Sequence, residues 1–86
     1  MLEKNLQKNM VKHLTDNGWF VVKTVATASA GFPDLFLLKN GRTVHVEVKT
    51  PTGKLSARQR MVIDDLRGHG GEVIVARSIA DLKILA

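Results

Sequence analysis

The sequence predicts an α/β fold in which a mixed β-sheet is flanked by helices. Three observations support this: a helical hydrophobic repeat near the N-terminus, an Asn40-Gly41 turn between two apolar runs, and a second helical segment that precedes one short apolar run. The expected order is α-β-β-β-α-β-α. A strand that returns after a helix usually runs parallel to its neighbour. We therefore expect residues 1–86 to form one domain around a mixed sheet.

The first helix is expected from about Leu2 to Asn17, because apolar side chains recur at positions 2, 6, 10 and 14. Asn17-Gly18 should end this helix. Residues 19–23, Trp-Phe-Val-Val-Lys, predict a buried first strand. Residues 26–31 predict a loop of small residues, long enough to move and to let a phosphate backbone come close.

A β-hairpin follows from Asn40-Gly41, since a type I′ turn needs positive φ at both central residues. With these residues as the loop, Lys39 pairs with Arg42 and Asp34 faces Glu47. One face of the hairpin is then wholly apolar and consists of Leu35, Leu37, Val44, Val46 and Val48. The opposite face carries Asp34, Phe36, His45, Glu47 and Lys49.

The second helix is expected from Leu55 to Arg67, and the glycine-rich residues 68–71 should stop it. Ser56 and Gln59 have the spacing of a capping box. Residues 72–76 predict a short apolar strand. Ser78 should then cap one or two last helical turns, whose apolar residues are Ile79, Leu82 and Leu85.

Asp34 and Glu47 are an unusual pair of neighbours. Directly opposed side chains have Cβ atoms about 4.5–5.5 Å apart, and like charges there destabilise a sheet. A cation between them removes this penalty, and hard divalent ions such as Mg²⁺ bind carboxylate oxygens. Lys49 points to the same side as Glu47. Two carboxylates, the Val48 carbonyl and an ammonium make a site for phosphodiester hydrolysis, where a metal activates water and the lysine orients it.

Four motifs, in this order along the chain, resemble the VRR-NUC (virus-type replication-repair nuclease) domain of the PD-(D/E)xK nuclease superfamily. They are Glu3-Lys4-Asn5-Leu6-Gln7, Gly31-Phe32-Pro33-Asp34, Glu47-Val48-Lys49 and Leu55-Ser56-Ala57-Arg58-Gln59. The resemblance implies a restriction-endonuclease-like αβββαβ core and a metal-dependent DNA endonuclease. The implied catalytic residues are Asp34, Glu47, Lys49 and Gln59. The implied cofactor is Mg²⁺ or Mn²⁺, with Glu3 as a further ligand beside Asp34, Glu47 and Val48.

Several of these residues also have an ordinary structural explanation. Glu3 and Gln7 suit the polar start of an amphipathic helix, where acids favour the helix dipole. Gln59 can cap its helix, contact the active site, or do both. His45 shares the face of the carboxylates but is expected to pack at the rim of the site rather than to bind a metal.

The charge balance points to a polyanionic partner. The chain has 13 Lys and Arg against 8 Asp and Glu, a net charge of +5, and such proteins bind phosphates with release of counterions. The candidate nucleic-acid contacts are Arg58, Arg60, Lys23 and Gln7. For the two arginines, an ordinary role on the protein surface is an equal alternative.

Composition also limits the possible cellular location, metal sites and partners. The absence of cysteine excludes disulfides and thiolate metal sites, and is compatible with a reducing cytoplasm. No apolar stretch approaches the roughly 18 residues of a membrane span. We therefore expect no membrane partner and a cytoplasmic location in a bacterial or phage-infected cell.

Two functions of different class fit these features: a metal-dependent DNA endonuclease, and a non-catalytic basic module that binds nucleic acid with the same fold. The endonuclease is favoured, because pure binding gains nothing from two opposed acids near phosphate. An RNA-directed nuclease is a weaker third, since the sequence shows no aromatic stacking platform.

We expect the DNA to be chosen by structure, with a four-way (Holliday) junction or other branched DNA as substrate in replication, recombination or repair. We also expect a homodimer, because two-fold symmetry places two identical sites on a symmetric junction. Apolar residues near the C-terminus either form part of its interface or are buried within one chain: Ile79, Leu82, Ile84 and Leu85.

Overall fold

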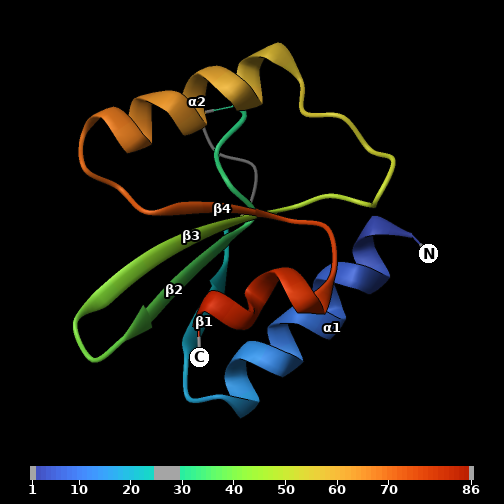
Figure 1. The fold of residues 1–86 in the computed structure, drawn as a ribbon, viewed down its shortest axis with the longest axis vertical. Coiled ribbons are helices and arrows are strands. Elements are labelled where there is room, and N and C mark those ends of the chain that lie inside the picture. Colours follow the sequence, from blue (N-terminus) through green and yellow to red (C-terminus); the bar gives the residue numbers. More distant parts are fainter. Residues whose placement is uncertain (1, 25–29, 86) are drawn as a thin grey trace.

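The computed structural model describes residues 2–24 and 30–85, which form a four-stranded sheet with helices on both sides (Figure 1). The elements in chain order are α1 (Glu3–Asp16), β1 (Phe20–Lys23), β2 (Leu35–Lys39), β3 (Arg42–Val48), α2 (Ala57–Gly68), β4 (Val73–Ala76) and the 3₁₀ helix η1 (Ile79–Leu85). The strand order is β1-β2-β3-β4; β4 runs parallel to β3 and the other neighbours are antiparallel. The predicted α/β class and mixed sheet are confirmed.

The hairpin of β2 and β3 has the predicted register. Asn40 and Gly41 have φ of +50° and +80°, as a type I′ turn requires, and Lys39 pairs with Arg42. The five apolar side chains of the inner face are all 0% exposed. Pairing stops at Leu35 and Val46, so Asp34 lies just before the paired strand and is not part of the ladder.

The first strand is not buried as predicted. Trp19 is buried, but it precedes the strand, and the side chains of Phe20 and Val22 are 62% and 41% exposed. The reason lies in the sheet order, since β1 is an edge strand that pairs with β2. α2 packs over β4, at the other edge of the sheet. The apolar side chains of β1 that point away from α1 therefore face solvent.

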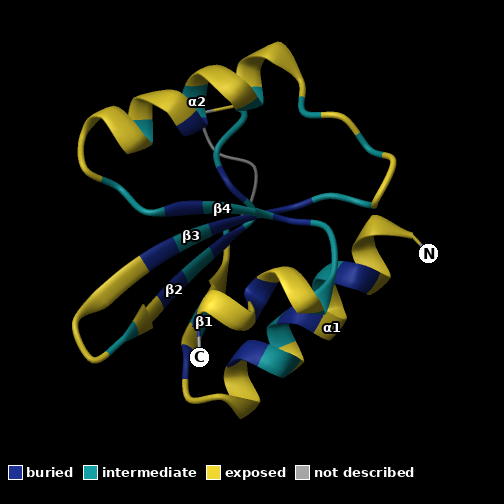
Figure 2. Cartoon of the chain, in the orientation of Figure 1, coloured by how far each residue is buried: buried dark blue, intermediate teal, exposed yellow. Residues whose placement is uncertain are grey.

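The hydrophobic core lies between the sheet and the layer formed by α1 and η1 (Figure 2). α1 contributes its buried side chains at helical spacing: Leu6, Met10 and Leu14. Leu82 and Leu85 of η1 are 2% and 1% exposed, and the Trp19 indole donates a 2.9 Å hydrogen bond to the Leu85 carbonyl. Burial within the chain thus explains these two leucines. Of the four C-terminal apolar residues, Ile84 is the one that is largely exposed, at 67%.

The capping box of the second helix is confirmed. The Gln59 amide donates to the Ser56 hydroxyl at 3.0 Å, and the Gln59 side-chain oxygen accepts from the Ser56 amide at 2.9 Å. At the start of η1, the Asp81 carboxylate accepts from the Arg77 amide at 2.8 Å, whereas Ser78 contributes its carbonyl. The loop predicted at residues 26–31 falls mostly on residues 25–29, which lie outside the described residues.

Candidate active site

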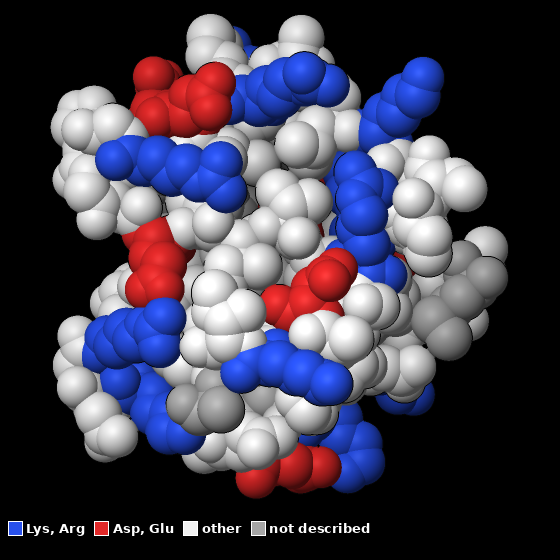
Figure 3. Space-filling model, viewed as in Figure 1, with Lys and Arg blue, Asp and Glu red and all other residues white. Residues whose placement is uncertain are grey.

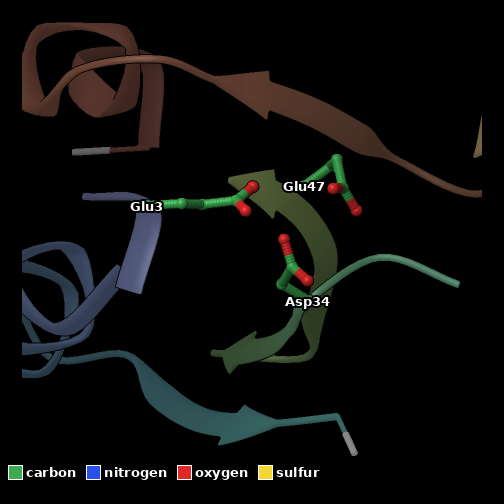
Figure 4. Close-up of side chains that lie close together, drawn as sticks. All are labelled: Glu3, Asp34 and Glu47. Carbon is green, nitrogen blue, oxygen red and sulfur yellow. The ribbon is translucent and has the colours of Figure 1, made fainter. Parts of the chain in front are cut away.

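Three carboxylates converge at the end of the sheet near the start of α1. Glu3, Asp34 and Glu47 each offer one oxygen, and these oxygens lie within 4.8 Å of one another. Figure 4 shows the three side chains pointing toward one another from the first turn of α1, the segment before β2, and β3. The reach of Glu3 toward the other two acids, which the sequence left open, is therefore present in the fold. Oxygen ligands at such separations suit one hard divalent cation.

Backbone groups fix the Asp34 carboxylate. The Val48 amide donates to Asp34 Oδ2 at 2.8 Å, across the end of the β2–β3 ladder. The Thr24 amide donates to the Asp34 carbonyl at 2.9 Å, and the Thr24 hydroxyl donates to the Pro33 carbonyl. The end of the sheet thus holds the Asp34 carboxylate in place beside the other two acids.

The Glu47 side chain is buried in the protein at 1% exposure. Gln59 Nε2 donates to its Oε2 at 3.2 Å, while Oε1 is buried without a hydrogen-bond partner among the described residues. Burial, and then the neighbouring charge of Asp34, raise the pKa of Glu47 to about 8; Lys49 opposes this shift. A buried unsatisfied acceptor costs roughly 1–3 kcal/mol. A proton or a cation bound at Oε1 would remove that cost, so the residues fit a divalent metal.

Lys49 completes the cluster on the same face of β3. Its ammonium nitrogen lies 3.7 Å from Glu3 Oε1 and 3.7 Å from Glu47 Oε2. The side chain is only 14% exposed, so its charge acts in a partly desolvated site where electrostatic interactions are stronger than in water. The ammonium can thus interact both with the acids and with an anionic group brought to them.

Gln59 combines the two roles that the sequence left open. Its side-chain oxygen closes the capping box of α2, and its side-chain nitrogen contacts the Glu47 carboxylate. The amide can serve both because its oxygen accepts and its nitrogen donates. The start of α2 is thereby tied to the carboxylate cluster.

Gly31 brings the segment before Asp34 close to α2. Its φ is +85°, and a Cβ there would lie 2.9 Å from Arg58 Cγ and 3.0 Å from the Arg58 carbonyl oxygen. Arg58 Nε also donates to the Ala30 carbonyl at 3.2 Å. This contact was not predicted from the sequence. A glycine three residues before Asp34 could have indicated it, because glycine allows a close approach of the backbone.

The other candidate DNA contacts lie on three different elements of the fold. Lys23 is exposed at the end of β1 opposite Leu35, Arg60 is exposed in the first turn of α2, and Gln7 is half-buried one turn after Glu3. The Val48 amide binds Asp34; its carbonyl as a metal ligand stays a prediction, as do the assigned roles of the other candidates.

His45 packs as expected, between two aromatic rings. Its ring centroid lies 5.4 Å from that of Phe32 and 5.8 Å from that of Phe36, both at steep angles. Burial lowers the pKa of His45, which favours the neutral ring at neutral pH. The sequence placed Phe36 and His45 on the active face of the sheet, and the structure adds the Phe32 ring to them.

Basic side chains are spread over the molecule rather than gathered in one place on the face viewed in Figure 3, where acidic side chains lie between them. Contacts with a polyanion therefore depend on which individual cations lie near the carboxylate cluster.

Within the described parts of the chain, no helix has both the length and the apolar character needed to cross a membrane.

The family model of the VRR-NUC domain matches residues 1–80. A solved structure described as "VRR_NUC domain" is similar with a TM-score of 0.84 and 28% identity, over 96% of this chain and 91% of that one. Another, described as "VRR_NUC domain protein", has a TM-score of 0.78 and 18% identity, over 99% and 84% respectively, and supports the fold alone. Among curated proteins, none matches.

The sheet, its flanking helices and these matches define a nuclease-type α/β fold. The chain belongs to the VRR-NUC domain family.

Proposed function

We propose that the protein is a metal-dependent DNA endonuclease, formed by residues 1–86 as one domain. The observation that carries this proposal is the convergence of Glu3, Asp34 and Glu47 beside the ammonium of Lys49. Three carboxylates repel a phosphate group unless a bound cation neutralises their charge. Glu47 Oε1, which is buried and has no hydrogen-bond partner in the described part of the chain, supports such a cation, and Mg²⁺ or Mn²⁺ is the expected ion.

In the proposed hydrolysis reaction, the residues of the site have different roles. Glu3, Asp34 and Glu47 would hold the ion, with the Val48 carbonyl as a further ligand. When bound, the ion supplies Lewis-acid activation of phosphate and water. Lys49 orients the attacking water and offsets charge on the scissile phosphate. Gln59 keeps the Glu47 carboxylate in place through its 3.2 Å hydrogen bond.

The non-catalytic alternative is less well supported. A module that only binds DNA has no use for a glutamate that is 1% exposed and close to two other acids. Such a residue lowers stability and repels phosphate. A basic binding surface would be better served by an apolar residue at this position.

The direct test is incubation of the purified protein with branched, nicked, flapped and linear DNA in the presence of Mg²⁺, Mn²⁺ or EDTA. We expect cleavage with either ion, none with EDTA, and faster cleavage of branched DNA. Cleavage that persists in EDTA, or an absence of cleavage on every substrate with both ions, would contradict the proposal.

Lys49→Ala is expected to lower the cleavage rate at least about a hundredfold while Mn²⁺ binding is retained, because an ammonium stabilises developing charge but is not a metal ligand. Single-turnover cleavage and calorimetry measure the two effects. The matched control is Lys12→Ala, roughly 13 Å along α1 from Glu3, whose exposed ion pair with Asp16 contributes little to stability. Loss of Mn²⁺ binding in Lys49→Ala would refute the role assigned to this lysine.

Arg58→Ala and Arg60→Ala are each expected to weaken DNA binding and to reduce the slope of log affinity against log salt by about 1. Both arginines lie in the first turn of α2, and the N-terminal end of a helix also favours anions. Fluorescence anisotropy at several salt concentrations measures this. Arg42→Ala is the control, since Glu72 already pairs with that guanidinium at the hairpin turn. Slopes equal to that of the wild type in both test variants would leave them as ordinary surface arginines.

The proposed assembly is a homodimer that nicks a four-way junction in the cytoplasm, with one site on each of two opposed strands. Because Leu82 and Leu85 are buried within the chain, a different surface is needed. Phe20 and Leu38 are directly paired and exposed, at 62% and 38%, and Val22 lies on the same face. Apolar side chains gathered in this way commonly mark an interface.

Light scattering at micromolar concentration is expected to give about twice the chain mass of 9.5 kDa. Phe20→Lys should return the protein to the monomer and turn paired cuts in a junction into single nicks. Thr15→Lys is the control, since Thr15 is exposed on α1, which packs against the opposite face of the sheet. A monomeric wild type that cuts linear duplex as readily as junctions would overturn the assembly and leave the nuclease proposal standing.

A further inference from the structure

A cleft of about 310 Å³ lies between α2 and the segment that precedes β2. Its apolar walls are formed by Phe32, Val62 and Leu66, and its polar side chains are Arg58, Asp65 and His69. The volume is at the lower end of the range of roughly 300–1,000 Å³ that is typical of small-molecule pockets. The cleft is therefore of a size to hold one planar ring system rather than a DNA duplex.

Both walls of the cleft lead to the carboxylate cluster. Phe32 precedes Asp34 by two residues, and Arg58 adjoins Gln59, whose amide contacts Glu47 at 3.2 Å. The contact of Arg58 with the Ala30 carbonyl closes this end of the cleft. His69 lies just past the C-terminal end of α2, roughly 16 Å from Arg58 along the helix axis. The cleft thus begins beside the proposed site of cleavage and extends away from it under one face of the helix.

The lining suits the chemistry of a nucleobase. Proteins that hold an unstacked base place its faces between aromatic or apolar side chains and bind its edge by hydrogen bonds. Here Phe32 offers an aromatic wall that the His45 ring supports from the side, with ring centroids 5.4 Å apart. Asp65 and Arg58 offer an acceptor and donors. A phosphate fits less well, because a carboxylate and three apolar side chains share the space with a single guanidinium.

We propose that this cleft receives one unstacked nucleobase of the DNA substrate, from a nucleotide close to the scissile phosphate. The proposal rests on the proposed nuclease function and deepens it. Extruding a base is least costly where pairing or stacking is already weakened, as it is at the ends of the duplex arms that meet at a branch point. The cleft therefore provides a physical basis for selecting branched over continuous duplex DNA without reading a base sequence.

The first test uses the wild-type protein. A set of branched substrates carries a single abasic site at each nucleotide near the scissile phosphate, and binding is measured in EDTA and cleavage in Mn²⁺. We expect one position at which removal of the base weakens binding or slows cleavage about fivefold or more, from the usual strength of base–aromatic stacking. Equal behaviour at every position would overturn the proposal.

The second test asks whether that base occupies this cleft. Val62→Phe fills the cleft with a ring, and is expected to reproduce the loss on the intact substrate and to cause no further loss on the sensitive abasic one. Met61→Phe is the matched control, because Met61 is the neighbouring residue of α2, outside the lining and 49% exposed. Equal losses for Val62→Phe on both substrates would place the base elsewhere. If Val62→Phe does not fold, Asp65→Trp, which fills the cleft from an exposed position of its lining, is judged by the same criterion.

These outcomes separate the two proposals. A protein that cuts branched DNA but tolerates an abasic site at every position has the nuclease activity without the base-binding cleft. A protein that neither binds nor cuts DNA refutes both.

Discussion

Asp34→Asn and Glu47→Gln are each expected to abolish DNA cleavage while DNA binding stays intact or becomes tighter. Each change keeps the shape of the side chain and removes an anionic metal ligand. In Asp34→Asn, a neutral amide takes the place of the carboxylate in the cluster, without the charge that a divalent ion needs. Loss of an outer partner of a metal ligand already costs roughly 10–100-fold. We expect loss of the ligand itself to exceed that range.

Binding should not weaken in either variant. Replacing the Asp34 carboxylate, in a site where three acids offer oxygens within 4.8 Å of one another, relieves repulsion of the DNA phosphates. Below pH 8 the metal-free Glu47 carboxyl is mostly protonated, so Glu47→Gln should leave binding intact. Cleavage is measured in single-turnover reactions with Mn²⁺, and binding by anisotropy in EDTA. Asp16→Asn is the matched control, because Asp16 ends α1 at the opposite end from Glu3 and is exposed. Full activity of both test variants would discredit the assigned site.

The sequence predicted the parts of the site whose geometry is local. The Asn40-Gly41 turn determines the register of the hairpin, and that register places Glu47 and Lys49 on one face. The capping box places Gln59 in the first turn of α2 with its side chain turned back. In both cases a backbone requirement within a few residues determines where the side chain points.

Other parts depend on packing between distant elements. Glu3 reaches the hairpin only because Leu6, Met10 and Leu14 dock α1 on the sheet, and no local rule determines that docking. The contact of Gly31 with Arg58 depends on how α2 crosses the sheet. The cleft between α2 and the segment before β2 depends on the same placement of α2. The sequence therefore did not predict that Phe32 lines a cleft.

The prediction that the first strand is buried was wrong for a related reason. Trp-Phe-Val-Val is a run that a buried strand and an edge strand can share, since hydrophobicity alone does not reveal strand order. The edge position of β1 and the placement of α2 over β4 leave Phe20 exposed. Of the two explanations left open for the C-terminal leucines, burial within the chain holds for Leu82 and Leu85.

The stability of the metal-free protein is expected to fall as the pH rises from about 5 to about 8. In the folded chain the pKa of Glu47 is raised to about 8, first by burial and then by the charge of Asp34, whereas in the unfolded chain it is near 4.5. Between these values the folded state binds the proton and the unfolded state does not. The stabilising proton is fully bound below pH 4.5 and is lost as the pH passes through 8.

The expected slope is up to about 1.4 kcal/mol in the free energy of unfolding per pH unit in this window. For a domain of this size, each 1 kcal/mol corresponds to roughly 4–8 °C in Tm. Thermal unfolding in EDTA at several pH values measures this directly. Glu47→Gln should remove the decline, because the amide stays neutral throughout. Glu72→Gln is the control and should keep it, since Glu72 is exposed and Arg42 lowers its pKa.

Mn²⁺ is expected to reverse this decline. A cation competes with the proton for the Glu47 carboxylate, so the rise in Tm on adding Mn²⁺ should be large at pH 8 and small at pH 5. In Glu47→Gln the rise should be much smaller at both pH values. Because this test needs no DNA, it examines the metal site separately from cleavage. A rise in Tm that is independent of pH, and equal in wild type and Glu47→Gln, would mean that Mn²⁺ binds elsewhere, and the buried glutamate would then need a different explanation.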